Sequence, residues 1–358
     1  MIPFFSGLRV VLALELRQRV RGVAWYVLIG IFVVLVGLVT AAVWFTTAGF
    51  DLDNDEGGSA IFSAIIYFVL LLGTLVAPAL SGNAINGDRE AGTLATTQVT
   101  LITTWQLILG KFLAAWITAL AFLVASLPFL IIALAVGGVG KGTIVVSILF
   151  LAIELGVIAA IGVGLSGIFS KPLFSIVVTY LVVAALTLGT LITFGLAGAA
   201  TQTEWKSTYV TGITYDETTG EAITCGEPEV NVSKRPRFDF YWPILAANPF
   251  VVLADAAPSR LDDGFPRDLF GTIKLGVRTA QLAPESSEYY DECNSELNTG
   301  YFDDMDDSLT PQQIVDSTVP SWFVGLAIQL ALGAAALWGA WSRTNTPART
   351  LSKGSRIA

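Results

Sequence analysis

Two glycine-rich stretches of this chain come close to nucleotide-binding motifs. Residues 162–167, GVGLSG, match the G-x-G-x-x-G spacing that lets a backbone approach a pyrophosphate at the start of a helix. They lie inside a long apolar run with no strand signal before them, so we expect their small residues to let membrane helices pack closely. Residues 137–143, GGVGKGT, resemble a phosphate-binding loop, but Ala135 stands at the first glycine position and Gly142 follows Lys141. We therefore predict no nucleotide-binding site in this chain.

Histidine is absent from the sequence and only two cysteines are present. Zinc, haem and Cys/His catalytic sites need several of these side chains at short, characteristic spacings. Cys225 and Cys293 stand far apart. We predict no catalytic residues, no metal ligands and no cofactor in this chain, and we do not expect it to be an enzyme.

One acidic residue lies in the middle of an apolar run. Glu154 falls near the centre of residues 143–169, where burying an ionisable group costs about 2.5–3.5 kcal/mol on insertion scales. We expect its side chain to face protein or water rather than lipid. Three roles stay open for it: lining a transport path or sensing a substrate, a structural hydrogen bond to a Ser, Thr or Tyr on a neighbouring helix, and an incidental protonated acid.

The elements that must position these residues are apolar runs long enough to cross a membrane. The chain has 358 residues, of which 54% are hydrophobic and only 14% charged, a balance typical of integral membrane proteins. About 20 helical residues span the hydrocarbon core of a bilayer. Six runs reach that length, and they cover residues 23–45, 59–80, 112–136, 143–169, 173–197 and 321–341. The first run is too long for the core of a signal peptide, so we expect no cleaved signal.

Residues 1–22 precede the first run and combine apolar with basic side chains. The apolar residues recur at helical spacing, while most of the arginines fall off that stripe; the stripe is Phe4, Phe5, Leu8, Val11, Leu12 and Leu16. This pattern indicates an amphipathic helix that lies in the membrane interface. The alternative is a cytoplasmic extension of the first span, since Gly22 is the one break between the two.

The distribution of lysine and arginine predicts the topology of the six spans. An even number of spans places both termini on one side, and that side carries 11 basic residues against three acids. The opposite side holds the long segment 198–320, with 21 acidic and 8 basic residues. By the positive-inside rule, both termini, including the basic tail 342–358, are cytoplasmic, and residues 198–320 are extracellular, in a plasma membrane.

Residues 198–320 are expected to fold as a small extracellular domain of α+β or irregular structure. Their one apolar stretch, residues 238–257, is interrupted by Pro243 and Pro249. We favour a core or membrane-surface segment, such as two short helices at the outer mouth, over a seventh span. The predicted fold class is an all-α polytopic membrane protein. It has six transmembrane helices, an N-terminal interfacial helix and this domain between the fifth and sixth spans.

The longest polar segment predicted to be cytoplasmic, apart from the termini, is the loop 81–111. Asn86-Gly87 is expected to end the incoming helix, and Gly92-Thr93 to break the chain before a new helical turn. Thr103 and Gln106 have the S/T-x-x-Q spacing of a capping box, which predicts the start of the helix that re-enters the membrane. We expect the loop to be a compact helical elbow.

Residues 87–94, GDREAGTL, and residues 103–111, TTWQLILGK, resemble the signature loop of ABC-2 type transporter permeases. Those proteins commonly carry E-x-G-T-L and then a helix ending in G-K between their second and third spans. The resemblance also covers the six-span frame and the N-terminal helix. It implies a permease subunit that exports a hydrophobic or amphipathic substrate and pairs with a second, identical or homologous, permease. It also implies two cytoplasmic ABC ATPase subunits, which hold the ATP and Mg.

The loop is the expected docking surface for the ATPase, since charges on it can pair at the rim of an interface and apolar side chains can fill a cleft. The expected docking residues are Asp88, Arg89, Glu90, Gly92, Thr93, Leu94 and Val99. Membrane lipid surrounds such a subunit, and no nucleic acid is expected as a partner. The alternative function is a non-transporting scaffold or sensor whose acidic extracellular domain binds a ligand or partner. A secondary transporter is less favoured, because coupling ions usually leave more than one buried charge.

Cys225 and Cys293 both fall in the predicted extracellular domain, where oxidising conditions favour a disulfide. Closing a loop of about 70 residues would stabilise that domain by roughly 4 kcal/mol in the chain-entropy model. We expect non-reducing peptide mapping of the mature protein to recover the two cysteines in one linked peptide pair. Recovery of both as free thiols, the alternative state, would contradict the pairing.

Overall fold

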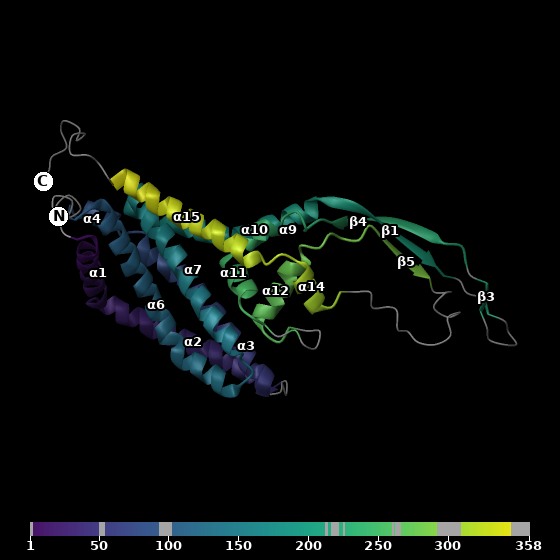
Figure 1. Cartoon of the computed structure of the whole chain (residues 1–358). Coiled ribbons are helices and arrows are strands. Elements are labelled where there is room, and N and C mark those ends of the chain that lie inside the picture. The colour runs from purple at the N-terminus through teal and green to yellow at the C-terminus, as the bar shows by residue number, and fades with distance from the viewer. Residues whose placement is uncertain are drawn as a thin grey trace.

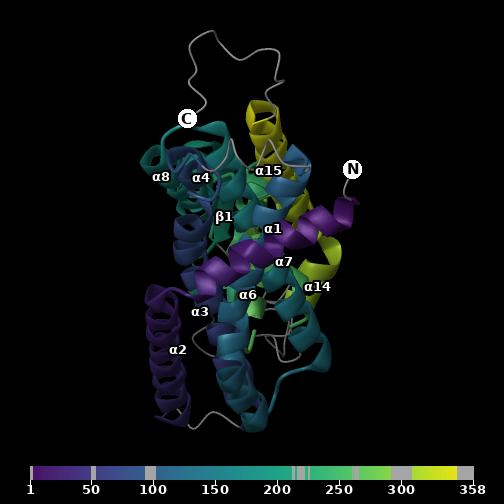
Figure 2. The same ribbon diagram turned by 90° about the vertical axis from the view of Figure 1, so that its left-hand side faces the viewer.

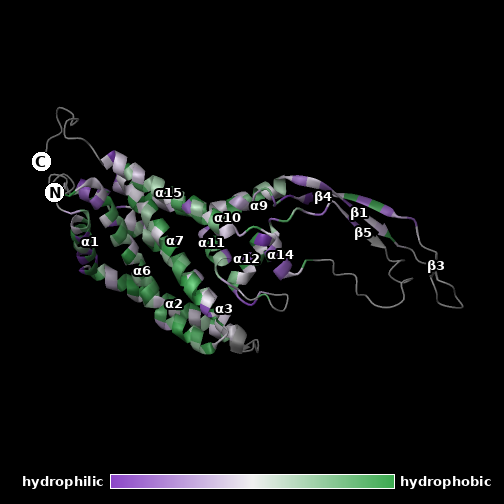
Figure 3. Ribbon diagram, viewed as in Figure 1, coloured by the Kyte–Doolittle hydropathy of each residue, from purple (hydrophilic) through white to green (hydrophobic). Residues whose placement is uncertain are grey.

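A bundle of long helices dominates this computed structural model, which describes residues 3–49, 54–92, 102–211, 214–215, 222–224, 226–259, 261, 266–291 and 309–344 (Figure 1). Within these residues, six helices are long and apolar enough to cross a membrane. They are α2 (Val23–Gly49), α3 (Asn54–Ser81), α6 (Thr104–Val136), α7 (Lys141–Ile168), the run of α8 (Pro172–Ala184), η1 (Ala185–Gly189) and α9 (Thr190–Ala200), and α15 (Ser321–Thr344). Hydrophobic residues concentrate in this bundle (Figure 3). The six predicted runs are confirmed, and they are the pattern of a multi-pass membrane protein.

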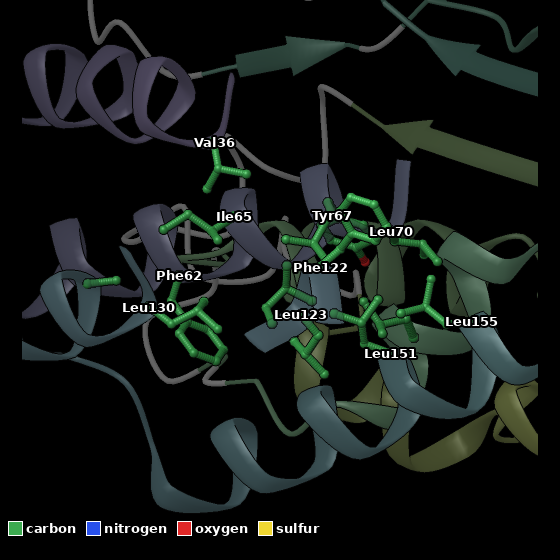
Figure 4. Close-up of a cluster of buried hydrophobic side chains, with 14 of the residues drawn as sticks. Val36, Phe62, Ile65, Tyr67, Leu70, Phe122, Leu123, Leu130, Leu151 and Leu155 are labelled. Atoms are coloured by element: carbon green, nitrogen blue, oxygen red, sulfur yellow. The ribbon is translucent and has the colours of Figure 1, made fainter. Parts of the chain in front are cut away.

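Helices α3, α6 and α7 pack against one another at the centre of the bundle, with α2 against α3 and α15 against α7. The buried core contains branched aliphatic and aromatic side chains, among them Ile65, Phe122 and Leu155 (Figure 4). The outer helices leave apolar side chains exposed, such as Phe45 of α2 and Leu196 of α9. Lipid tails are as apolar as these side chains, so such faces are suited to a bilayer.

Small residues bring α7 and α15 into close contact. A Cβ atom placed on Gly164 would lie 2.5 Å from the Cβ of Ala336, and one on Gly167 would lie 2.5 Å from the Cβ of Ala340. A methyl group does not fit at either position, so the absence of side chains is what lets the two helices approach. The prediction that residues 162–167 serve helix packing is confirmed.

Helix α1 (Phe4–Val20) is separate from the first span and crosses beside α6 (Figure 2). Residues 21–22 interrupt the helix before α2 begins, so α1 is not an extension of the first span. Its buried face consists of Gly7 and Val11, and Val11 packs over Gly110 of α6. Phe5, which is 80% exposed, points away from this contact. Part of the predicted apolar stripe therefore stays available to a membrane surface.

A small sheet extends from one end of the bundle, which we call the domain end (Figure 1). Its central strand β1 pairs antiparallel with β4 and parallel with β5, and a second, two-stranded sheet joins β2 and β3. The elements of this region are β1 (Gln202–Val210), β2 (Thr214–Tyr215), β3 (Ala222–Thr224), β4 (Glu229–Pro236), β5 (Ser287–Asp291), and the helices α12 (Leu269–Thr279) and α14 (Pro311–Ser317). The predicted mixture of helix and strand is present. Cys225 and Cys293 lie outside the described residues, so their pairing stays a prediction.

The apolar stretch 238–257 forms two short helices, α10 (Trp242–Ala246) and α11 (Pro249–Ala256). This pair, which we call the hairpin, packs against α7, α9 and α15. Ala246, Val252 and Leu253 are fully buried. The prediction of a core segment with two short helices is confirmed, and the core that this stretch joins is that of the bundle. The reason is that its apolar side chains are buried against the spans.

A buried ion pair fixes the hairpin to the last span. The Nε of Arg278 donates to Oδ1 of Asp255 at 2.8 Å, and both side chains are almost fully buried. The other carboxylate oxygen of Asp255 accepts from the backbone N–H groups of Ser321 and Trp322, at the first turn of α15. Arg278 also donates to the carbonyl of Thr318 at 2.8 Å. The pair therefore fixes α11, α12 and the start of α15 together.

The fifth span contains a π-helical turn, η1, in a run that the sequence predicts to be uniformly apolar. A π-turn interrupts the regular bonding of an α-helix and is common at functional sites. The carbonyl of Thr187 in this turn accepts a hydrogen bond from Nδ2 of Asn248 at 2.7 Å. The hairpin therefore supplies a partner for the irregular segment of the span.

We predict that Gly164→Ala destabilises the protein, because the added methyl group would collide with the backbone of Ala336. Overpacking of this kind costs about 1–3 kcal/mol. Gly195→Ala is the matched control, since no atom lies within 4 Å of a Cβ at that position, and alanine favours helix. Thermal unfolding in detergent should show a lower midpoint for Gly164→Ala and an equal or higher midpoint for Gly195→Ala. Equal midpoints in the two variants would contradict a close contact between α7 and α15.

Candidate functional site

The predicted coupling loop lies at the end of the bundle opposite the sheet, which we call the loop end (Figure 1). Helix α3 ends at Ser81, and a short turn leads into α4 (Asn86–Glu90). Asn86-Gly87 therefore starts a helix and does not end the incoming one, which corrects the expectation from the sequence. The physical reason is a cap from another span, because Oγ of Ser166 in α7 accepts from the N–H groups of Ile85 and Asn86 at 2.9 and 3.1 Å.

Two other local signals of the loop are confirmed, while the helical turn expected to begin at Thr93 lies outside the described residues. Gly92 has a φ of +70°, which suits glycine and breaks the chain after α4. Thr103 and Gln106 form the predicted capping box at the start of α6, with both reciprocal hydrogen bonds present. The amide Nε2 of Gln106 also donates to the carbonyl of Phe4 at 3.0 Å. The same residue therefore caps α6 and attaches the N-terminal end of α1.

Lys111 is the centre of the charged contacts at the loop end. Its side chain is almost fully buried, and its Nζ lies 2.7 Å from Oδ2 of Asp88 and also contacts Oε1 of Glu15. These three residues come from α6, α4 and α1. Since the lysine is buried and each acid is at least partly covered, the ion pairs fix the three helices relative to one another.

Arg89 faces inward as well. Its guanidinium donates to Oδ1 of Asn86 and to the carbonyl of Phe169, both at 3.0 Å, and lies 3.4 Å from the carbonyl of Gly167. Phe169 and Gly167 carry carbonyls at the C-terminal end of α7, where a cation is favoured by the helix dipole. Arg89 therefore attaches α4 to the fourth span.

Arg19 makes a similar contact from α1 to α3. Its guanidinium donates to the carbonyl of Leu80 at 3.2 Å, one residue before α3 ends. Burial lowers the pKa of Arg19, and the nearby Glu15 carboxylate opposes this effect. We call Glu15, Arg19, Asp88, Arg89 and Lys111 the loop-end cluster. Through it the short helix α4 is joined to α1, α6 and α7, and α1 is joined to α3.

The structure describes four of the seven predicted docking residues, and these four fall into two groups. Asp88 and Arg89 turn into the loop-end cluster, whereas Glu90 and Gly92 are exposed. The sequence predicts that Asp88, Arg89 and Glu90 all lie at the rim of an interface. In the structure, the side chains of Asp88 and Arg89 point inward instead. Their partners are distant in the sequence and could not be read from the loop alone. The other three predicted positions, Thr93, Leu94 and Val99, lie outside the described residues.

Three members of the loop-end cluster were not predicted from the sequence, namely Glu15, Arg19 and Lys111. Lys111 carried one signal that could have found it, namely a single basic residue within an otherwise apolar helical run. Such a residue needs a counter-charge, and Glu15 is the one acid in residues 1–22. Their 96-residue separation hides the pair from any local pattern.

Glu154 is fully buried in α7, as expected for a group that avoids lipid. Its carboxyl lies beside the side chain of Gln329 on α15, and no hydrogen bond from a Ser, Thr or Tyr reaches it within the described residues. The glycine-rich residues 137–143 form the turn from α6 into α7. That turn lines a cavity of about 210 Å³ at the domain end, together with Arg267 and Asp268.

No family model matches the chain. No curated protein matches it either. The resemblance to ABC-2 type permeases therefore rests on residues 87–94 and 103–111 and on the six-span frame with its N-terminal helix.

We predict that Lys111→Met destabilises the protein by up to about 3 kcal/mol, because Glu15 and Asp88 lose their shared counter-charge. The two acids keep some access to water, which limits the loss. Lys171→Met is the matched control, since Lys171 is exposed, and its substitution should change stability by less than about 0.5 kcal/mol. Thermal unfolding of both variants in detergent measures the difference. Equal unfolding midpoints would mean that the Lys111 ion pairs do not stabilise the loop end.

Proposed function

We propose that this chain is the permease subunit of an ABC-2 type exporter, whose ATP is hydrolysed by a separate nucleotide-binding subunit. The observation that carries the proposal is the burial of Lys111 between Glu15 and Asp88. A membrane protein driven by an outside motor needs a rigid element that receives the force and passes it to the spans. The loop that resembles the family signature has such a connection.

The proposed path of the force starts at the exposed surface of α4. Glu90 and Gly92 are exposed there, and the following segment with Leu94 would fill a cleft on the ATPase. A displacement of α4 would move α6 through Asp88 and Lys111, and α7 through Arg89. Glu15 would carry the same displacement into α1. One docking event would thus reorient several helices together.

The remaining parts of the proposal follow the family resemblance. Two ATPase subunits bind ATP and Mg on the cytoplasmic side of a plasma membrane, where both termini of this chain lie. Two permease subunits, identical or homologous, form the path for a hydrophobic or amphipathic substrate. The six apolar helices support a membrane location for such a subunit.

The alternative is a scaffold or sensor that transports nothing. It is favoured by the exposed sheet at the domain end, since almost every side chain of β4 is exposed, including Val230 and Val232. A sheet that leaves apolar side chains open on a strand is suited to contact a partner. Association with an ABC ATPase would separate the two functions, because only the permease requires it.

We predict that the tagged chain, co-expressed with ABC ATPase subunits from its own source, co-purifies with one of them. Glu90→Arg combined with Leu94→Asp should weaken that association at least tenfold, about 1.4 kcal/mol, because both changes fall on the proposed docking surface. Arg89 is left intact because it attaches α4 to α7. Glu204→Arg is the control for a change of surface charge, since Glu204 is exposed on β1 at the domain end.

The readout is the amount of ATPase retained and its hydrolysis rate in reconstituted vesicles. Full association and unchanged hydrolysis in the loop variant would refute the docking surface. The failure of every ATPase to associate with the unmodified chain would favour the scaffold or sensor.

A further inference from the structure

The tip of the hairpin makes polar contacts with two spans, one on each side. Its turn, Ala247-Asn248, lies between α10 and α11. On one side, Nε2 of Gln329 in α15 donates to the carbonyl of Ala247 at 3.1 Å. On the other side, Nδ2 of Asn248 donates to the carbonyl of Thr187 at 2.7 Å and contacts Oγ1 of Thr190 at 2.9 Å. All of these side chains except that of Thr187 are buried.

Glu154 completes this group from the side of α7. Its side chain has no exposed surface, and neither carboxyl oxygen has a hydrogen-bond partner of normal geometry among the described residues. The Oε1 atom of Gln329 is equally buried and also lacks a partner in that part of the chain. Because Nε2 of Gln329 is committed to Ala247, the orientation of this amide is fixed. The amide of Gln329 therefore lies between the Glu154 carboxyl and the hairpin, and its Oε1 atom has no donor among the described residues.

Four buried or half-buried charged or titratable groups on the helices packed against α7 have partners elsewhere, and Arg343 of α15 is exposed. Asp255 of α11 pairs with Arg278 at the domain end, and Lys111 of α6 pairs in the loop-end cluster. Tyr67 of α3 donates to Phe250, and Tyr180 of α8 donates to Leu75. The polar group found against the Glu154 carboxyl is the Gln329 amide, and no counter-charge accompanies it in the described residues.

A bare carboxylate in such a place costs several kcal/mol, whereas a neutral acid carries an O–H that can donate to Oε1 of Gln329. We propose that Glu154 is a proton-binding site of the α7–α15 seam, and that the bound proton holds the hairpin in place. The step is the addition of a proton from solution to the carboxylate, which yields the neutral acid, and it is reversible. The proton provides a donor for Oε1 of Gln329, which has none among the described residues.

Loss of the proton would remove the O–H donor and leave a carboxylate beside the Gln329 amide, whose N–H group it attracts. The amide Nε2 of Gln329 would then turn from the carbonyl of Ala247 toward the carboxylate, and its bond to the hairpin would break. Binding and release of the proton would thereby couple to movement of the hairpin between α7 and α15.

This inference does not depend on the proposed ATPase partner, so the test uses the purified full-length chain in lipid nanodiscs. The first measurement is difference infrared spectroscopy of unmodified protein against Glu154→Gln at neutral pH. We expect the unmodified protein to show the C=O stretching band of a protonated carboxyl group that is missing from Glu154→Gln. Glu154→Gln is close in shape and supplies its own N–H donors, so it should fold. Absence of the band would overturn the proposal.

The second measurement is hydrogen exchange of the backbone amides of residues 242–256 over a range of pH, corrected for the intrinsic rates. In the unmodified protein, protection of this segment should fall at least about tenfold as pH rises above neutral, while Glu154→Gln should stay protected throughout. The same pH dependence in both proteins, or none in either, would overturn the coupling to the hairpin. Sodium and choline buffers are compared at each pH. Protection that follows sodium and not pH would assign the site to a metal cation and overturn the proton.

Discussion

A polar group buried between membrane helices has no water to bond, and this constraint decides how the loop end of the protein is built. Lys111 enters the apolar run of α6 with a charge that needs a partner, and Glu15 and Asp88 supply it from two other helices. The last carbonyls of α7 have the same need, which Arg89 meets. Each satisfied group attaches one element to the next. The connection between the loop and the spans is therefore a consequence of solvation and does not require a large interface.

Helix α7 contacts both the loop-end cluster and the polar group around Glu154 and the tip of the hairpin. Near its C-terminal end it bonds α4 through the hydroxyl of Ser166 and the carbonyl of Phe169. Near its middle it carries Glu154, which lies against α15 and the tip of the hairpin. Between them, Gly164 and Gly167 keep α7 and α15 in close contact. Close packing transmits strain, so α7 offers a physical connection between the loop end and Glu154. In the proposed exporter, proton binding and ATPase docking would act on the same helix.

At the domain end, buried polar groups also obtain their partners from other elements of the fold. Prolines keep residues 238–257 from forming a spanning helix, yet their apolar side chains still need to be buried. The hairpin meets both conditions by inserting between α7, α9 and α15 and by obtaining polar partners for its turn and its ends. Asp255 and Arg278 then attach it to the first turn of α15. The sheet beyond it has little apolar surface to bury and extends away from the bundle (Figure 1).

The sequence by itself determined what depends on neighbours along the chain. Apolar runs long enough to span a bilayer, the capping box of Thr103 and Gln106, the glycine break at Gly92 and the prolines of the hairpin all act through adjacent backbone groups. Only the tertiary structure decided where the charged side chains point. Asp88 and Arg89 resemble solvated loop charges in the sequence, but their partners lie on other helices. The same applies to Glu154, whose neighbour Gln329 comes from the last span. The physical reason is that the pairing of a buried polar group is set by which helices pack side by side, and the local sequence does not encode that choice.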